Sequence, residues 1–270
     1  MFSCRVCDLF FIHPYPSESE QFWDSVIDNS FDEIETPDSQ RHYRTEINFY
    51  RRYFPIIEQD LRYARSFLDI GCGTGRLLEL LYKYPNLYRT GIELNADRAA
   101  VARKKSGCEI HQIPIENFFS EKKFDVITLI NVFSHIPWFD RLFHSIRSLV
   151  SENGRIIIKT GELAKETEKR DMFDWSIPVH VHFLGLGTID YLCRTYGFTK
   201  LRHDRIPIAE ELFSTETWKS PGHSAARNVL KQIIAHTPLA LPFLKWRYTR
   251  KHGGHIYSSY IVLSPGLKGM

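Results

Sequence analysis

A glycine-rich turn restricts the possible folds of this chain more than any other feature. The apolar run Phe67–Ile70 is followed by Gly71, Gly73 and Gly75, and leucines then recur at helical spacing over positions 77–81. Glycine lets the backbone turn sharply and lets a ligand approach it closely. The free N–H groups at the start of a following helix favour a negatively charged group. The motif therefore predicts a ligand-binding turn that joins a buried strand to a helix.

Short apolar runs alternate with amphipathic helical runs from residue 67 to about residue 160. We expect strands at 67–70, 88–93, 109–113, 124–130 and 155–159, and helices at about 77–81, 96–105 and 139–150. This alternation is typical of a parallel sheet with helices on both faces. Right-handed crossovers then place the glycine turn at the carboxyl edge of the sheet.

The two ends of the chain have a less regular pattern. Prolines punctuate residues 1–40, and residues 41–66 have helical spacing with an interruption at Pro55. Beyond the fifth strand we expect a helix at 188–196, a strand at 198–206, a helix at 225–235 and a closing strand at 255–264.

Composition indicates an ordinary globular protein, with 43% hydrophobic residues, 25% charged residues and a formal charge of +3. That charge is too small to indicate a nucleic-acid partner. Met1–Pro16 has no secretory pattern, and the apolar segment Ile233–Leu244 is broken by His236, Pro238 and Pro242. The five cysteines are scattered, as in a reducing compartment. We therefore expect a cytoplasmic protein with no stable membrane insertion.

Two acidic residues accompany the glycine turn. Asp69, at the end of its strand, can accept hydrogen bonds from turn amides or from a ligand ammonium group. Glu93 ends the second strand, where a carboxylate can accept both hydroxyls of an unphosphorylated ribose. The dinucleotide fingerprint requires glycine at the position of Arg76, which argues against an NAD-dependent oxidoreductase but leaves it as an alternative.

Residues 67–160 resemble the class I S-adenosylmethionine-dependent methyltransferases. The resemblance rests on the glycine turn, on Glu93, on the strand that begins Phe124-Asp-Val-Ile, and on Asn131-Val-Phe-Ser-His135. It implies an α/β fold with a doubly wound, mostly parallel seven-stranded sheet, Rossmann-like, whose last strand is antiparallel. It also implies methyl transfer from S-adenosyl-L-methionine to an acceptor.

The same resemblance implies which residues contact the cofactor. The glycine turn would hold the methionine part, Glu93 the ribose, and Leu94 the border of the adenine, while Asn131 and Val132 would lie under the sulfonium arm. The full set of expected cofactor-binding residues is Asp69, Gly71, Cys72, Gly73, Gly75, Glu93, Leu94, Ile115, Glu116, Asn131 and Val132.

The chain departs from the family pattern at two positions. Pro114 stands where many members carry an acid that contacts the adenine amine, so Ile115 and Glu116 are the expected substitutes. Ser134 stands where members often have glutamate. These departures leave a second alternative open, a catalytically inactive cofactor-binding scaffold of the same fold.

Histidines are the candidates for a base that removes a proton from the acceptor. His135 follows the fourth strand, and His180 matches a histidine that many members place over the acceptor pocket, here within Trp175–Leu184. His182 is an additional histidine at strand spacing from His180, so both would face one side of an extended segment. A purely structural histidine is the alternative at each position, and the spacing does not predict a metal site.

Cys4 and Cys7 resemble the second half of a zinc knuckle found ahead of some methyltransferases. The first cysteine pair is absent, and two thiolates do not complete a tetrahedral site, so no zinc is expected. Near the other end, a basic cluster indicates a solvated helix end or, alternatively, contact with an anionic acceptor or a membrane surface. This cluster contains Lys245, Arg247, Arg250, Lys251 and His252, with Trp246 and Tyr248 between them.

The expected organisation has two parts. Residues 1–60 form an N-terminal lid with a partial knuckle and a helix, and residues 61–270 form the methyltransferase domain. An insertion at about 207–254 completes the acceptor side. The expected acceptor is a small molecule, such as a glycan or secondary-metabolite precursor.

Overall fold

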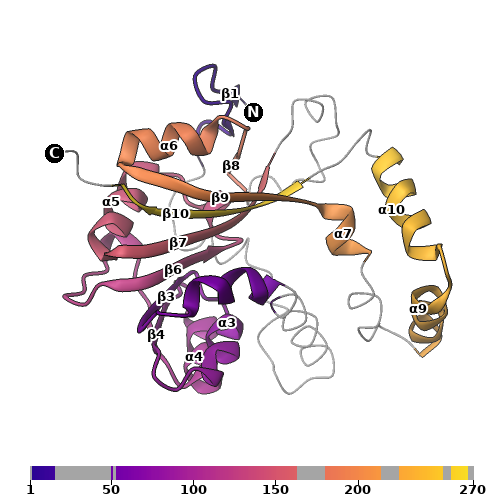
Figure 1. Ribbon diagram of the computed structural model, residues 1–270, viewed down its shortest axis with the longest axis horizontal. Coiled ribbons are helices and arrows are strands. Elements are labelled where there is room, and N and C mark those ends of the chain that lie inside the picture. Colours follow the sequence, from indigo (N-terminus) through magenta and orange to yellow (C-terminus); the bar gives the residue numbers. More distant parts are fainter. Residues whose placement is uncertain are drawn as a thin grey trace.

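A computed structural model describes residues 2–15, 50, 53–162, 180–213, 225–251 and 257–266. Its main sheet has seven strands in the order β5–β4–β3–β6–β7–β10–β9 (Figure 1). The strands are β3 (Ser66–Ile70), β4 (Tyr88–Ile92), β5 (Glu109–His111), β6 (Phe124–Ile130), β7 (Val150–Glu162), β9 (Phe198–Pro207) and β10 (Tyr257–Pro265). Strands β5 to β7 pair in parallel, and β10 is antiparallel to both β7 and β9. The predicted doubly wound sheet with an antiparallel last strand is confirmed.

Helices cover both faces of this sheet (Figure 1). The helices are α3 (Arg76–Leu80), α4 (Ala96–Ser106), α5 (Phe139–Leu149), α6 (Thr188–Tyr196), α7 (Ile208–Leu212), α9 (Ala225–His236) and α10 (Ala240–Lys251). Single 3₁₀ turns are η2 (Leu81–Lys83), η3 (Ile115–Asn117) and η4 (Phe133–His135). Residues 53–61 are also helical. None of the described helices is long and apolar enough to cross a bilayer.

The alternation of side chains along the strands divides the apolar interior into two cores. In β6, Ile127 and Leu129 belong to the core under α5 and α6, whereas Val126 belongs to the core under α3, α4 and residues 53–61. In β7, Ile156 and Ile158 similarly belong to the first core. This period of two explains why the parallel strands are apolar on both faces.

The boundaries of α4 follow from its end residues. The side-chain oxygen of Asn95 accepts the Arg98 N–H at 2.9 Å, which caps the first turn. Gly107, at φ +64°, ends the helix in the left-handed conformation that favours glycine. The loop before α4 therefore has a fixed shape, and it contains Glu93.

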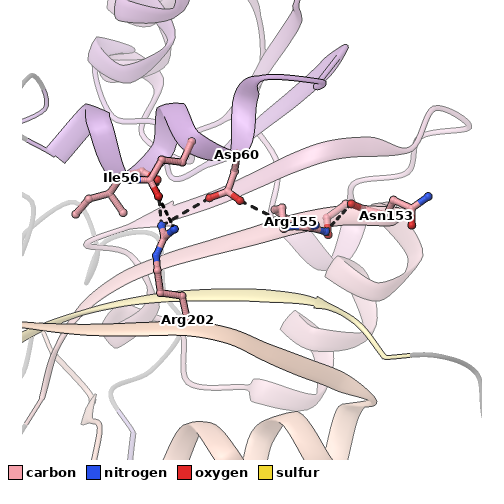
Figure 2. A network of polar contacts seen from close by, with 7 residues as sticks. Ile56, Asp60, Asn153, Arg155 and Arg202 are labelled. Atoms are coloured by element: carbon pink, nitrogen blue, oxygen red, sulfur yellow. Dashed lines mark hydrogen bonds and ion pairs between the residues drawn. The ribbon is translucent and has the colours of Figure 1, made fainter.

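Helix 53–61 is held against the sheet by a polar network (Figure 2). Asp60 lies 3.8 Å from Arg155 Nε on β7 and 3.7 Å from an Arg202 nitrogen on β9. Arg202 also donates to the Ile56 carbonyl at 3.1 Å. The predicted interruption at Pro55 is wrong, since residues 53–61 are helical through it.

The N-terminal residues form a small second sheet. It contains β1 (Phe2–Ser3), β2 (Phe10–Phe11) and β8 (His182–Phe183), all antiparallel. Thr188 at the start of α6 donates its hydroxyl to the Cys7 carbonyl at 2.8 Å. A Cβ on Gly185 would lie 2.0 Å from the Asp8 carbonyl oxygen, so this close approach requires glycine. The segment 2–15 is thus attached to the main body, although its pattern alone predicts only irregular structure.

Helices α9 and α10 stand on the far side of α7 from the sheet (Figure 1). The sequence predicts α9, and beyond it only a helix end at the basic cluster 245–252, whereas the structure has a separate helix over 240–251. Pro242 falls in the first turn of α10, where its missing N–H leaves no intrahelical bond unmade. The helices are separated at residues 237–239, close to the predicted break at Pro238.

Candidate functional site

The three turn glycines have left-handed φ angles of +67° at Gly71, +55° at Gly73 and +78° at Gly75. A Cβ on Gly71 would lie 2.3 Å from Val132 Cγ2, and one on Gly75 would lie 2.9 Å from the Ala102 backbone. A Cβ on Gly73 would meet nothing within 4 Å among the described residues. The outer two glycines therefore allow close packing, while the backbone of Gly73 borders open space that a ligand can enter.

The Glu93 carboxylate connects two loops at this edge of the sheet. One oxygen accepts the Gly73 N–H at 2.8 Å, and the other accepts the Asn95 N–H at 3.0 Å. The Glu93 amide donates to the His111 carbonyl at the end of β5 at 3.1 Å. Glu93 is only 7% exposed. Its carboxylate is therefore held in place beside the open glycine.

Asp69 lies at the end of β3 with its carboxyl group buried. One carboxyl oxygen accepts the Thr128 hydroxyl at 2.6 Å. The pKa of Asp69 is raised to about 7, mainly by burial; the Thr128 hydrogen bond opposes the rise, and the nearby negative charge of Glu93 adds to it. A positively charged group that arrived here would favour the ionised carboxylate.

The carboxyl end of β6 has an unusual backbone conformation. Asn131, at φ +59°, donates its N–H to the Lys159 carbonyl at 2.9 Å, and its side-chain oxygen accepts from Lys159 Nζ at 2.7 Å. Val132 packs against Gly71. Sequence reasoning missed Lys159, which is 7% exposed, and the available signal was a lysine within the apolar strand Arg155–Thr160.

The remaining expected cofactor residues have varied environments. Cys72 is buried, donates its N–H to the Ile92 carbonyl at 2.9 Å, and has a thiol whose pKa is raised by burial. Ile115 is buried in η3, which Pro114 precedes, whereas Leu94 and Glu116 are exposed. All of them lie at loops that follow β3, β4 and β5, which meet at the carboxyl edge.

The two candidate base residues lie together. The rings of His135, in η4, and His180 have centroids 4.7 Å apart. The backbones are joined beside them, because the Val181 N–H donates to the Ser134 carbonyl at 2.9 Å. The segment 163–179, which contains Trp175, lies outside the described residues.

His182 has a different environment from His180 despite the strand spacing. It is fully buried between Phe133 and Phe139, and its Nε2 donates to the Ile136 carbonyl at 2.7 Å. The pKa of His182 is lowered to about 4, mainly by burial; the hydrogen bond to Ile136 opposes the fall, and the neighbouring histidines add to it. His182 is therefore a neutral packing residue, while His180 is only partly buried.

Cys4 and Cys7 occupy a tight turn of the knuckle-like segment. The Cys4 N–H donates to the Leu9 carbonyl at 2.7 Å, and the Asp8 N–H donates to the Cys4 carbonyl at 2.9 Å. Backbone hydrogen bonds lower the pKa of the Cys4 thiol, and burial raises that of Cys7. Within the described ranges, no group of three or more His, Cys, Asp or Glu residues is placed to hold a metal ion. Backbone hydrogen bonds thus shape this turn.

Comparison with known proteins assigns the family. A family model described as a methyltransferase domain matches residues 23–203. The ubiquinone biosynthesis O-methyltransferase of Glaesserella parasuis is 32% identical over 109 residues, which cover 36% of this chain and 46% of that protein. The protein of the same name from Pasteurella multocida is 35% identical over 113 residues, with 36% and 46% covered. The chain thus spans about half the length of the curated relatives it matches.

Two solved structures of similar fold are methyltransferases. Haemonchus contortus phosphoethanolamine N-methyltransferase 2, in complex with S-adenosyl-L-methionine, has a TM-score of 0.64 at 15% identity, with 90% of this chain and 60% of that chain covered. Coclaurine N-methyltransferase, bound to N-methylheliamine and S-adenosylhomocysteine, has a TM-score of 0.56 at 16% identity, with 87% and 76% covered. The chain therefore belongs to the methyltransferase-domain family, and its fold is that of the class I S-adenosylmethionine-dependent methyltransferases.

Proposed function

We propose that the protein transfers a methyl group from S-adenosylmethionine to a hydroxyl oxygen of a small molecule. The observation that supports cofactor binding most directly is the Glu93 carboxylate, fixed 2.8 Å from the Gly73 amide beside open space. Oxygen as the accepting atom is supported by the relatives named O-methyltransferase and by two adjacent histidines that can serve a hydroxyl acceptor.

The residues of the site fit this cofactor. Glu93 would accept the ribose hydroxyls, and the buried Asp69 carboxyl would face the amino group of the methionine part. Leu94 and Ile115 would border the adenine, with Glu116 nearby. When bound, S-adenosylmethionine supplies an activated methyl group, so the protein contributes binding, orientation and exclusion of water.

A hydroxyl acceptor becomes a better nucleophile as it loses its proton, which requires a base. His135 and His180 are adjacent, and a neutral imidazole nitrogen accepts a proton near neutral pH. In this proposal one of them would accept the hydroxyl proton of the acceptor. Bound S-adenosylmethionine would supply the methyl group to the acceptor oxygen and leave as S-adenosylhomocysteine. That histidine later returns the proton to solvent. Asn131, held by Lys159, would position the acceptor beside the pair.

Calorimetric titration with S-adenosylhomocysteine, with NAD as the control ligand, tests cofactor binding. We expect binding of S-adenosylhomocysteine but not of NAD. Glu93→Gln should weaken it about 10- to 100-fold, since hydrogen bonds to charged groups are worth about 1.5–3 kcal/mol. Glu116→Gln, a matched change at an exposed carboxylate, should have a smaller effect. Absence of binding by the folded protein, or equal binding of NAD, would contradict the proposal.

Turnover with small phenolic acceptors tests the proposed base. His135→Ala or His180→Ala should lower turnover about 10²- to 10⁴-fold while S-adenosylhomocysteine affinity stays near normal. The control is His144→Ala, because His144 is an exposed histidine on α5. Unchanged turnover in both variants would reject the base. Cofactor binding without transfer to any acceptor would favour the inactive scaffold.

A further inference from the structure

The α9–α10 hairpin, residues 225–251, has a composition unlike the rest of the chain. No residue of α10 is buried, and neither is any described side chain of α9. Large apolar side chains that are 52–77% exposed lie along both helices. They are Val229, Leu230, Ile233, Leu239, Phe243 and Trp246. An exposed apolar set of this size marks an interaction surface.

The exposed aromatic residues of α10 lie on one side of the helix. Phe243 and Trp246 are about one helical turn apart, and their ring centroids are 5.7 Å apart, while Leu239 directly precedes the helix. A different side of α10 contacts α7, since Lys245 is paired with Glu210 and the Tyr248 ring lies 5.6 Å from Phe213. The apolar side is therefore directed away from α7.

The charges of the hairpin all have one sign. Residues 225–251 contain no aspartate or glutamate. Their Lys and Arg residues are Arg227, Lys231, Lys245, Arg247, Arg250 and Lys251. The whole chain has a formal charge of only +3, so positive charge is concentrated here. The Arg250 guanidinium carbon lies 5.4 Å from the centre of the Trp246 ring, which combines a cation and an aromatic group on one surface.

We propose that the α9–α10 hairpin docks on the surface of an anionic phospholipid bilayer. Its exposed apolar side chains would enter the boundary between headgroups and acyl chains, where tryptophan is favoured. Its cations would meet the anionic headgroups, whose negative potential attracts Lys and Arg near the membrane surface. The long Lys and Arg side chains can keep their charges at headgroup level while their stems lie along the apolar side.

Two other occupants fit these features less well. A symmetric dimer through the hairpin would place the cations of one copy opposite the same cations of the other, with no acid on either hairpin. Nucleic acid would meet the cations but would leave the large apolar side chains without a partner. The bilayer satisfies both features at once.

The hairpin follows a strand that ends at the carboxyl edge of the sheet, the same edge that carries the expected cofactor residues. Strand β9 is parallel to β7 and ends at Pro207, and both Pro207 and Glu162 pair with Tyr257 of β10. The chain therefore enters α7 and then the hairpin from the carboxyl edge of the sheet. The family model ends at residue 203, so the hairpin lies outside its match. The inference goes beyond methyl transfer and does not depend on it.

Co-sedimentation of the full chain with vesicles tests this proposal. We expect binding to phosphatidylcholine vesicles that contain phosphatidylserine, weak binding to phosphatidylcholine alone, and loss of binding at high salt. Phe243→Ser with Trp246→Ser should weaken binding at least about 10-fold, since two large apolar side chains would no longer be removed from water. Arg247→Glu with Lys251→Glu should remove the preference for phosphatidylserine.

The matched control changes exposed aromatics elsewhere. Tyr63→Ser with Phe119→Ser alters side chains that are each 84% exposed, and vesicle binding should not change. Melting temperatures verify that all variants fold. The proposal is overturned if anionic vesicles do not bind the protein, or if the Phe243/Trp246 variant binds them equally. It is also overturned if light scattering shows a dimer that this variant disrupts, or if the hairpin binds nucleic acid instead of vesicles.

Discussion

The carboxyl edge of β3–β6 and the α9–α10 hairpin use polar and apolar residues in opposite ways. At the edge, Asp69 and Glu93 are buried and hydrogen-bonded within the protein. On the hairpin, large apolar side chains are exposed, and the cations have no acid of the same hairpin to pair with. The edge is thus organised by contacts within the chain, whereas the hairpin is organised for contact with something outside it. Stability and pH dependence should therefore originate at the edge.

The largest expected loss of stability comes from a substitution in the glycine turn. Gly71→Ala should lower the free energy of unfolding by about 3 kcal/mol, because a left-handed residue with a Cβ costs roughly 1–2 kcal/mol and overpacking adds roughly 1–3 kcal/mol. The overpacking arises at Val132 Cγ2, 2.3 Å from the added atom. Urea unfolding measures this. Gly73→Ala is the control, with only the backbone cost, and equal losses in the two variants would contradict the packing account.

The next largest effect is the pH dependence of the free energy of unfolding, to which two buried titrating groups contribute with opposite signs. Asp69 has a pKa raised from 3.8 to about 7, so the folded state retains a proton that the unfolded state loses, and stability falls as pH rises through this range. His182 has a pKa lowered from 6.5 to about 4, so stability rises with pH between these values. Between pH 4 and pH 6.5 each group changes the free energy of unfolding by roughly 3 kcal/mol, since one pKa unit is worth about 1.4 kcal/mol.

In single variants, the free energy of unfolding should therefore change with pH in opposite directions. In Asp69→Asn, the free energy of unfolding should rise between pH 4 and pH 6.5 more steeply than in the wild type. In His182→Gln, it should fall as pH rises from 4 to 7. Denaturant titrations over this range measure both slopes. Identical pH profiles in the two variants and the wild type would contradict the assignment.

A smaller loss of stability is expected when ion pairs are removed, and it should differ between the sheet and the hairpin. Asp60→Ala removes the acid between Arg155 and Arg202 that holds helix 53–61 on the sheet (Figure 2). The loss should be about 1–3 kcal/mol, because partly buried arginine groups lose a charged partner. Lys245→Ala breaks the pair between α10 and α7, whose acid Glu210 is more exposed than Asp60, and should cost less than about 1 kcal/mol. The reverse order, measured by thermal unfolding, would show that the hairpin is the better anchored region.

The smallest effect is expected from removal of the hairpin. Replacing residues 225–251 by a short glycine–serine linker should change the free energy of unfolding by less than about 1 kcal/mol, because little apolar area is removed from water there. S-adenosylhomocysteine affinity should stay the same, and binding to anionic vesicles should disappear. A large fall in melting temperature would show that the hairpin stabilises the folded domain.

Local patterns were sufficient to predict the sheet and the glycine edge. Apolar periodicity and glycine spacing are short-range signals, and they located β3, β4, β6 and the turn that Glu93 supports. Long-range contacts were not predictable in the same way. The bond from Thr188 to Cys7 joins residues 181 positions apart, and it depends on how the whole chain folds.

Equal spacing also did not give equal environments. His180 and His182 lie two positions apart, yet only His182 is fully buried. Its ring packs against Phe133 and Phe139. Similarly, no sequence pattern joins Lys159 to Asn131, because their contact arises from the register of β7 beside β6. The catalytic roles of His135 and His180 and the cofactor contacts stay predictions.

The pairing of β9 with β10 has a consequence for how such proteins diversify. Pro207 and Tyr257 are opposite one another, so the chain leaves the sheet and returns to it at adjacent points. The entropy of closing a loop between two such points grows only slowly with loop length. Segments of different length and chemistry can therefore be exchanged between residues 207 and 257 without shifting the register of the sheet. Evolution or protein engineering can therefore replace this segment while the cofactor edge of the sheet stays unchanged.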